Sequence, residues 1–123
     1  MLNKSIVLTI QIAYIVVITV LSLVSIDTKT NINVDFADKI IHVIIHTINV
    51  ILLYIVFTKY KVAKSLLLAI IVSILYGIIV EILQEYIAIN RQFDIFDIYA
   101  NCFGTIIAAI ILKLKGKAIV KLI

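Results

Sequence analysis

Residues 80–101 have the sequence VEILQEYIAINRQFDIFDIYAN, which places four carboxylates and one arginine between two long apolar runs. An isolated charge at the centre of a membrane-spanning helix costs about 3 kcal/mol, so such residues are usually paired, hydrated or used for function. The runs on either side are apolar enough to lie in lipid. This stretch therefore predicts a connection between two membrane-spanning helices, with a polar site close to it.

The whole chain has the composition of a membrane protein. It contains 123 residues, 64% of them hydrophobic, with a mean hydropathy of +1.25, whereas soluble domains are about 45–50% apolar. We expect a single domain over residues 1–123, because the spans leave no room for a separate soluble domain. The net charge of +4 comes from lysines clustered between apolar runs, so no nucleic-acid partner is expected. Cys102 is the one cysteine, which excludes an intrachain disulfide.

Four apolar runs are long enough to cross a bilayer, which takes about 20 residues in a helix. They cover about residues 5–26, 39–58, 65–86 and 93–114. The chain contains no proline, so no span is interrupted by the loss of a backbone donor. The pattern predicts an all-α fold, a polytopic membrane four-helix bundle.

Positive residues predict how the bundle is oriented, because lysine and arginine in short loops stay on the cytoplasmic side. Eight of them lie near the two termini and in the middle loop: Lys4, Lys59, Lys61, Lys64, Lys113, Lys115, Lys117 and Lys121. The opposite side carries three: Lys29, Lys39 and Arg91. We therefore expect a multi-pass protein with its N- and C-termini in the cytoplasm.

Polar residues gather at the outer ends of the second, third and fourth spans, and each set repeats at three- or four-residue intervals. The three sets are Asp38, His42, His46 and Asn49; Gly77, Glu81 and Gln84; and Asp94, Asp97, Asn101 and Gly104. Residues at this spacing share one face of a helix. Ionisable residues inside membranes nearly always face the bundle interior or a wet cavity. We therefore expect the three faces to meet in one polar patch, with Asp94 also suited to cap the fourth helix.

Three motifs on these faces resemble the VanZ-like family of small integral membrane proteins, whose best-known member confers low-level resistance to teicoplanin. The motifs are DKIIH (residues 38–42), YGIIVEILQ (76–84) and RQFDIFDIYANCFG (91–104). The resemblance implies a protein of the bacterial cytoplasmic (inner) membrane with a role in the cell envelope, and links it to antibiotic resistance. The binding residues that we expect on these motifs are Asp38, Lys39, His42, Tyr76, Glu81, Gln84, Arg91, Asp94, Asp97 and Asn101.

The polar patch fits three functional classes, besides a network that only specifies helix packing. It could bind or shield a membrane lipid, a cell-wall precursor or a glycopeptide at the outer face. It could be a small intramembrane enzyme acting on a lipid headgroup, with His42, Glu81 and Asp97 as candidate catalytic residues. It could also belong to a proton or ion pathway. Binding ranks first, because the chain has no H-E-x-x-H, Gly-rich phosphate loop or serine elbow, and enzymatic activity stays open.

The charge of the patch bears on what it can bind. Five carboxylates against two cations leave a formal charge of −3 with neutral histidines, and like charges about 4 Å apart repel by roughly 4 kcal/mol at an effective dielectric near 20. Protonation of one carboxylate would relieve this repulsion. A divalent cation is the other relief, with Glu81, Glu85 and Asp97 as its candidate ligands.

Overall fold

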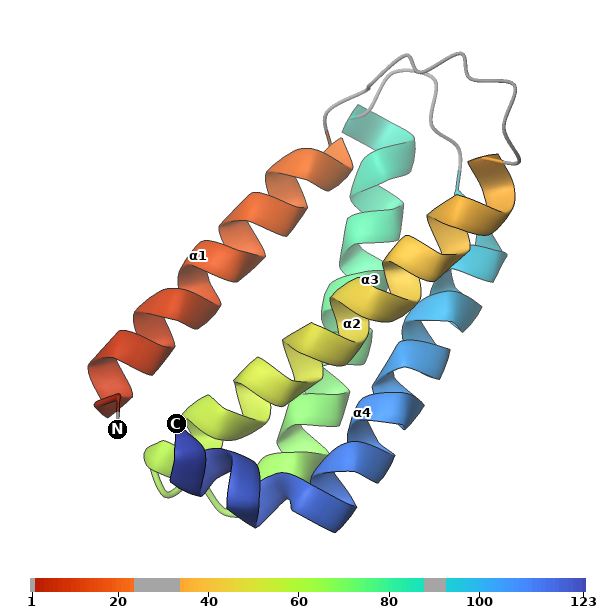
Figure 1. Ribbon diagram of the computed structural model, residues 1–123. Helices are drawn as coiled ribbons and strands as arrows, with labels where there is room; N and C mark the ends of the chain where they lie inside the picture. The colour runs from red at the N-terminus through yellow and green to blue at the C-terminus, as the bar shows by residue number, and fades with distance from the viewer. Residues whose placement is uncertain (1, 24–33, 88–92) are drawn as a thin grey trace.

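The computed structural model describes residues 2–23, 34–87 and 93–123, and of residues 34 and 35 the backbone alone. It contains four helices: α1 (Lys4–Leu23), α2 (Val34–Lys59), α3 (Ser65–Ile87) and α4 (Ile95–Leu122). Each is long and apolar enough to span a membrane, and the helices run alternately up and down (Figure 1). The all-α four-helix bundle is therefore confirmed.

Two helices are longer than the apolar runs predicted. α2 begins at Val34 rather than near Lys39, and α4 continues to Leu122 rather than ending near Leu114. Hydropathy locates the part of a helix that lies in lipid, whereas lysine and aspartate continue the same hydrogen-bonded helix beyond it. The expected end of the first helix near Ile26 lies outside the described residues.

The core lies on α2, which packs on each of the other three helices. One apolar cluster joins α2, α3 and α4 through Val50, Leu53, Ala69, Ala108 and Leu112. A second cluster joins α1 to α2 through Val7, Ile55 and Val56. The outer faces carry large exposed apolar side chains, which is the arrangement expected of helices that contact lipid rather than water.

α2 and α4 cross very closely at Gly104. A Cβ atom at this glycine would lie 3.1 Å from the backbone Cα and C atoms of Val43 and closer still to its carbonyl oxygen. The single proton of the Thr47 hydroxyl is shared between the carbonyls of Val43 (2.7 Å) and Gly104 (3.0 Å) at the same crossing. Small residues allow this approach between membrane helices, and the crossing brings the polar faces of α2 and α4 together.

The two termini and the α2–α3 turn lie together at one end of the bundle, called here the terminal end (Figure 1). The Leu2 amide donates to the Ile123 carbonyl (2.5 Å), and the Lys59 ammonium donates to the Leu2 carbonyl (2.6 Å). α2 ends in a Schellman turn, in which the Val62 and Lys61 amides donate to the carbonyls of Phe57 and Thr58, with Lys61 at φ 58°. The predicted polar site lies at the opposite end, called here the far end.

Candidate functional site

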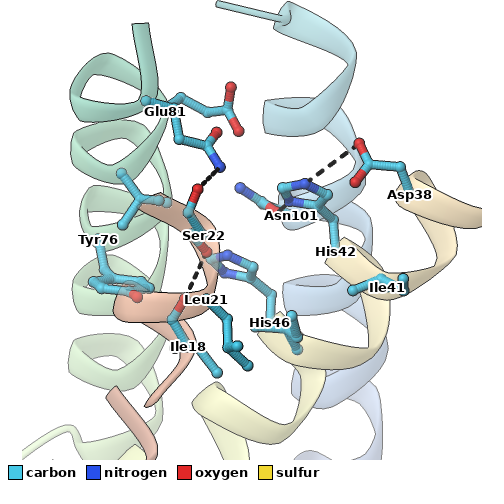
Figure 2. Close-up of a pocket in the computed structure, with 14 residues that line it drawn as sticks. Ile18, Leu21, Ser22, Asp38, Ile41, His42, His46, Tyr76, Glu81 and Asn101 are labelled. Carbon is cyan, nitrogen blue, oxygen red and sulfur yellow. Dashed lines mark hydrogen bonds and ion pairs between the residues drawn. The ribbon is translucent and has the colours of Figure 1, made fainter. Parts of the chain in front are cut away.

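A cavity of about 200 Å³ lies near the far end, between α1, α2 and α3, with Asn101 of α4 at its wall (Figure 2). This is well above the roughly 10–15 Å³ that one water molecule requires. Its lining is part apolar and part polar: Ile18, Leu21, Ser22, Asp38, Ile41, His42, Ile45, His46, Tyr76, Gly77, Val80, Glu81, Gln84 and Asn101. The helical spacing of the sequence brings these residues together, since each helix turns its polar face inward.

An ion cluster lies beside the cavity, centred on the ammonium of Lys39. Its Nζ atom donates to Asp94 Oδ2 (2.7 Å) and to Asp97 Oδ1, and lies 3.6 Å from Asp38 Oδ2. Asp94 also caps α4, because its Oδ1 accepts the Phe96 amide proton at 2.9 Å. The Lys39 ammonium, followed by the Phe96 amide, lowers the pKa of the Asp94 carboxyl below its ordinary value. Capping and ion pairing are therefore combined in Asp94.

His42 connects this cluster to the cavity. Its Nδ1 atom donates to Asn101 Oδ1 at 2.9 Å, since an amide carbonyl oxygen can only accept. Its Nε2 atom lies 3.7 Å from Asp38 Oδ2 and 3.6 Å from Asp97 Oδ1, which is too far for a hydrogen bond. The imidazole therefore has one fixed nitrogen and one nitrogen that faces two carboxylates.

A buried polar network begins at His46 in the cavity wall and extends toward the middle of the bundle. His46 Nδ1 lies 3.2 Å from the Ser73 hydroxyl oxygen, and the Asn49 side-chain amide donates to the same oxygen at 3.2 Å. Gln11 of α1 donates to Asn49 Oδ1 at 2.9 Å. All four side chains are buried, so the network holds α1, α2 and α3 in register where the site begins.

Glu81 is the most buried charged residue of the site, with 1% of its surface exposed. Neither of its carboxylate oxygens has a hydrogen-bond partner among the described residues. The side chain extends from α3 toward α4 (Figure 2), where Asp97 and Asp94 act on it electrostatically. One turn later, Gln84 donates to the Ser22 carbonyl of α1 at 2.9 Å.

The sequence matches the model of one known protein family. The family model described as VanZ/LLP1 matches residues 4–116, which includes α1, α2, α3, most of α4 and every residue of the cavity. The chain belongs to the VanZ/LLP1 family. No curated protein and no solved structure matches it.

In this VanZ/LLP1 bundle, the expected site residues fall into three groups. Those that line the cavity are Asp38, His42, Tyr76, Glu81, Gln84 and Asn101. Those in the adjoining ion cluster are Lys39, Asp94 and Asp97. Glu85 is exposed and lines neither, so the structure does not gather the metal-ligand set Glu81, Glu85 and Asp97. Arg91 lies outside the described residues.

The first helix, α1, also contributes to the site, although its sequence carries none of the residues expected there. Its residues Ile18, Leu21 and Ser22 line the cavity, and the Thr19 hydroxyl bonds the Tyr76 hydroxyl at 2.7 Å. A signal for this was present, because Gln11, Tyr14, Ile18 and Ser22 repeat at helical spacing on one face. None of these four residues carries a charge, so nothing in their charge marks this face as part of a polar site.

Proposed function

We propose that this VanZ/LLP1 protein binds the headgroup of an envelope lipid, or of a lipid-linked cell-wall precursor, in the cavity at the far end. The observation that carries the proposal is a cavity that joins the polar site to the lipid-facing surface. Leu21 of α1 and Ile41 of α2 line it and are also 58% and 52% exposed. A headgroup on the polar residues would therefore have a lateral path for its acyl or prenyl chain between α1 and α2.

The proposal includes an orientation in the cytoplasmic membrane, with both termini in the cytoplasm and the cavity in the outer leaflet. Its support is the distribution of charge in the fold. The terminal end carries lysines of the α2–α3 turn and the C-terminal part of α4, which are exposed, whereas Lys39 near the far end is held in ion pairs. Lysine and arginine residues in short loops and near the ends of the spans mark the cytoplasmic side.

The test is lipid retention by the purified protein, measured by native mass spectrometry. Phosphatidylglycerol, phosphatidylethanolamine, a polyprenyl-diphosphate sugar and teicoplanin are supplied separately, so that the four sources of ligand are distinguished. We expect at least one lipid to bind at one molecule per protein.

Gly77→Ala is the site variant for this experiment. A Cβ atom at Gly77 would lie 2.8 Å from Asn101 Nδ2 and 2.9 Å from His46 Cε1, so it displaces two polar groups that line the cavity. Gly116→Ala adds the same methyl group at the terminal end and serves as the control. Loss of lipid in Gly77→Ala but not in Gly116→Ala supports the proposal, whereas equal retention by both folded variants contradicts it.

A small intramembrane enzyme is the second candidate, and the geometry of His42 favours it. The hydrogen bond to Asn101 holds Nδ1, so Nε2 is the nitrogen available to exchange a proton with a bound headgroup. Incubation of the reconstituted protein with headgroup-labelled lipid tests this role. Product formed by the wild type and lost in His42→Gln would establish turnover. Labelled lipid that stays bound and unchanged would instead favour the binding role.

A further inference from the structure

We infer that Asp38, His42 and Asp97 form a site for a divalent metal ion, a property that does not depend on lipid binding. Each residue offers one ligand atom, and the three atoms lie within 4.8 Å of one another. His42 Nε2 lies 3.7 Å from Asp38 Oδ2 and 3.6 Å from Asp97 Oδ1. Metal bonds of about 2.1 Å hold neighbouring ligand atoms roughly 3.0–3.4 Å apart, so the two distances to Nε2 need to shorten by only a few tenths of an ångström.

The imidazole of His42 is already oriented for this role. A histidine that binds a metal almost always donates its other ring N–H to a carbonyl or carboxylate oxygen, and His42 Nδ1 donates to Asn101 Oδ1. In the neutral imidazole this bond leaves the lone pair on Nε2, directed at two carboxylates. Lone pairs on all three atoms repel one another unless a positive charge lies between them.

Glu81 provides an independent reason to expect a cation here. Asp38, Asp94 and Asp97 surround one ammonium, that of Lys39, which leaves two excess negative charges when His42 is neutral. Glu81 is 1% exposed, lacks a hydrogen-bond partner in the described part of the chain, and extends toward α4 (Figure 2), the helix whose first turn carries Asp97. A buried, uncompensated carboxylate is strongly unfavourable, and a divalent ion on Asp97 would offset it.

Lys39 competes with the metal for the same oxygens. Its ammonium contacts Asp97 Oδ1 and lies 3.6 Å from Asp38 Oδ2, the two atoms nearest to His42 Nε2. When a metal binds, the ammonium keeps its 2.7 Å bond to Asp94 and gives up the other two carboxylates. One imidazole and two carboxylates suit Zn²⁺ or Mn²⁺ better than Mg²⁺ or Ca²⁺, which prefer oxygen ligands alone.

The test is thermal unfolding of the full chain in detergent, after EDTA treatment and dialysis, with ZnCl₂, MnCl₂, MgCl₂ or CaCl₂ added. We expect Zn²⁺ or Mn²⁺ to raise the melting temperature of the wild type by several degrees, since a ligand that binds the folded state stabilises it. Glu85→Gln removes an exposed carboxylate outside the site and should respond like the wild type. His42→Gln and Asp97→Asn should lose the response.

Lys39→Met separates a metal site from a network that only packs the helices. It removes the competing ammonium, so we expect lower stability without metal and an affinity for Zn²⁺ or Mn²⁺ at least about tenfold higher. Electron spin-echo spectroscopy of the Mn²⁺-loaded wild type should show a coordinated imidazole nitrogen, even where the variants fail to accumulate. Identical melting of the wild type in every metal overturns the inference, as does a nitrogen signal that is absent or that survives in His42→Gln.

Discussion

Gly104→Ala offers a direct test of the α2–α4 crossing on which the site depends. The added Cβ atom would lie within 3.1 Å of the Val43 Cα and C atoms and nearer still to its carbonyl oxygen. Backbone atoms inside a helix cannot rotate away as a side chain can. The two helices therefore have to move apart, by about 1 Å, before the contact becomes an ordinary one.

The cost follows from two opposing effects. A separation of about 0.5–1 Å forfeits a quarter to a half of the dispersion energy of each contact along the crossing, which places the overpacking cost near the upper end of its usual range, about 3 kcal/mol. Alanine in place of glycine favours the helix itself by about 1 kcal/mol. We therefore expect Gly104→Ala to lower the free energy of unfolding by about 2 kcal/mol.

Gly116→Ala is the matched control, because its Cβ would meet the Tyr54 ring, with the hydroxyl oxygen at 2.8 Å, and an aromatic side chain can turn aside. We expect this variant to stay within about 1 kcal/mol of the wild type. Reversible unfolding in mixed micelles, followed by circular dichroism, measures both. Equal stability of the two variants would refute the reasoning, because the crossing would then tolerate a methyl group.

Three further predictions concern the loops and helix ends. The pKa of the Asp94 carboxyl is lowered in the folded state. The contribution of this carboxylate to stability is therefore complete above about pH 4 and is lost as the pH falls further. Asp94→Asn keeps the helix cap, so its melting temperature should depend less on acid pH than that of the wild type. Lys61→Gly should raise the free energy of unfolding by about 1 kcal/mol, because Lys61 has φ 58° and glycine adopts this conformation without strain. The control Lys113→Gly, inside α4, should lower the free energy of unfolding by about as much. In a Cys102→Ala background, Lys115→Cys should react with an impermeant thiol reagent only after the cells are opened, and labelling of intact cells would reverse the proposed orientation.

The fold follows from the sequence to a large extent, because the lipid environment restricts what an apolar run can form. Without water, each backbone group has to bond within its own segment, so the four runs could be assigned to helices by length alone. Helical spacing also placed Glu81, Gln84, Asp97 and Asn101 on buried faces, where the structure has them. The position of a residue along a span and its position around the helix both follow from its place in the sequence.

Pairing between helices could not be obtained in the same way. Helical spacing does not say whether Lys39 points to the headgroups or to Asp94 and Asp97, because a flexible four-carbon side chain reaches either. Depth at the outer end of the third span placed Glu81 and Glu85 in one patch, although the structure buries Glu81 and exposes Glu85. Residues four apart can differ in burial when a helix meets its neighbours at an angle. Whether Lys39 reaches Asp94 and Asp97 depends on the crossing of α2 and α4, where the backbones meet at Gly104 and Val43.

The manner in which α1 is attached has a consequence for biosynthesis. α1 is bound to later helices by polar contacts: Gln11 to Asn49, Tyr14 to the Ile45 carbonyl (2.7 Å), and the Ser22 carbonyl to Gln84. These partners are synthesised after α1, which therefore enters the bilayer as a solitary helix. Its single charged residue is Lys4, at its first position, so the helix is apolar enough to remain inserted in the bilayer on its own. Its lateral association with α2 and α3 can take place only after both have been synthesised, so an early stop in translation would leave an inserted but unassembled helix for membrane proteases to remove.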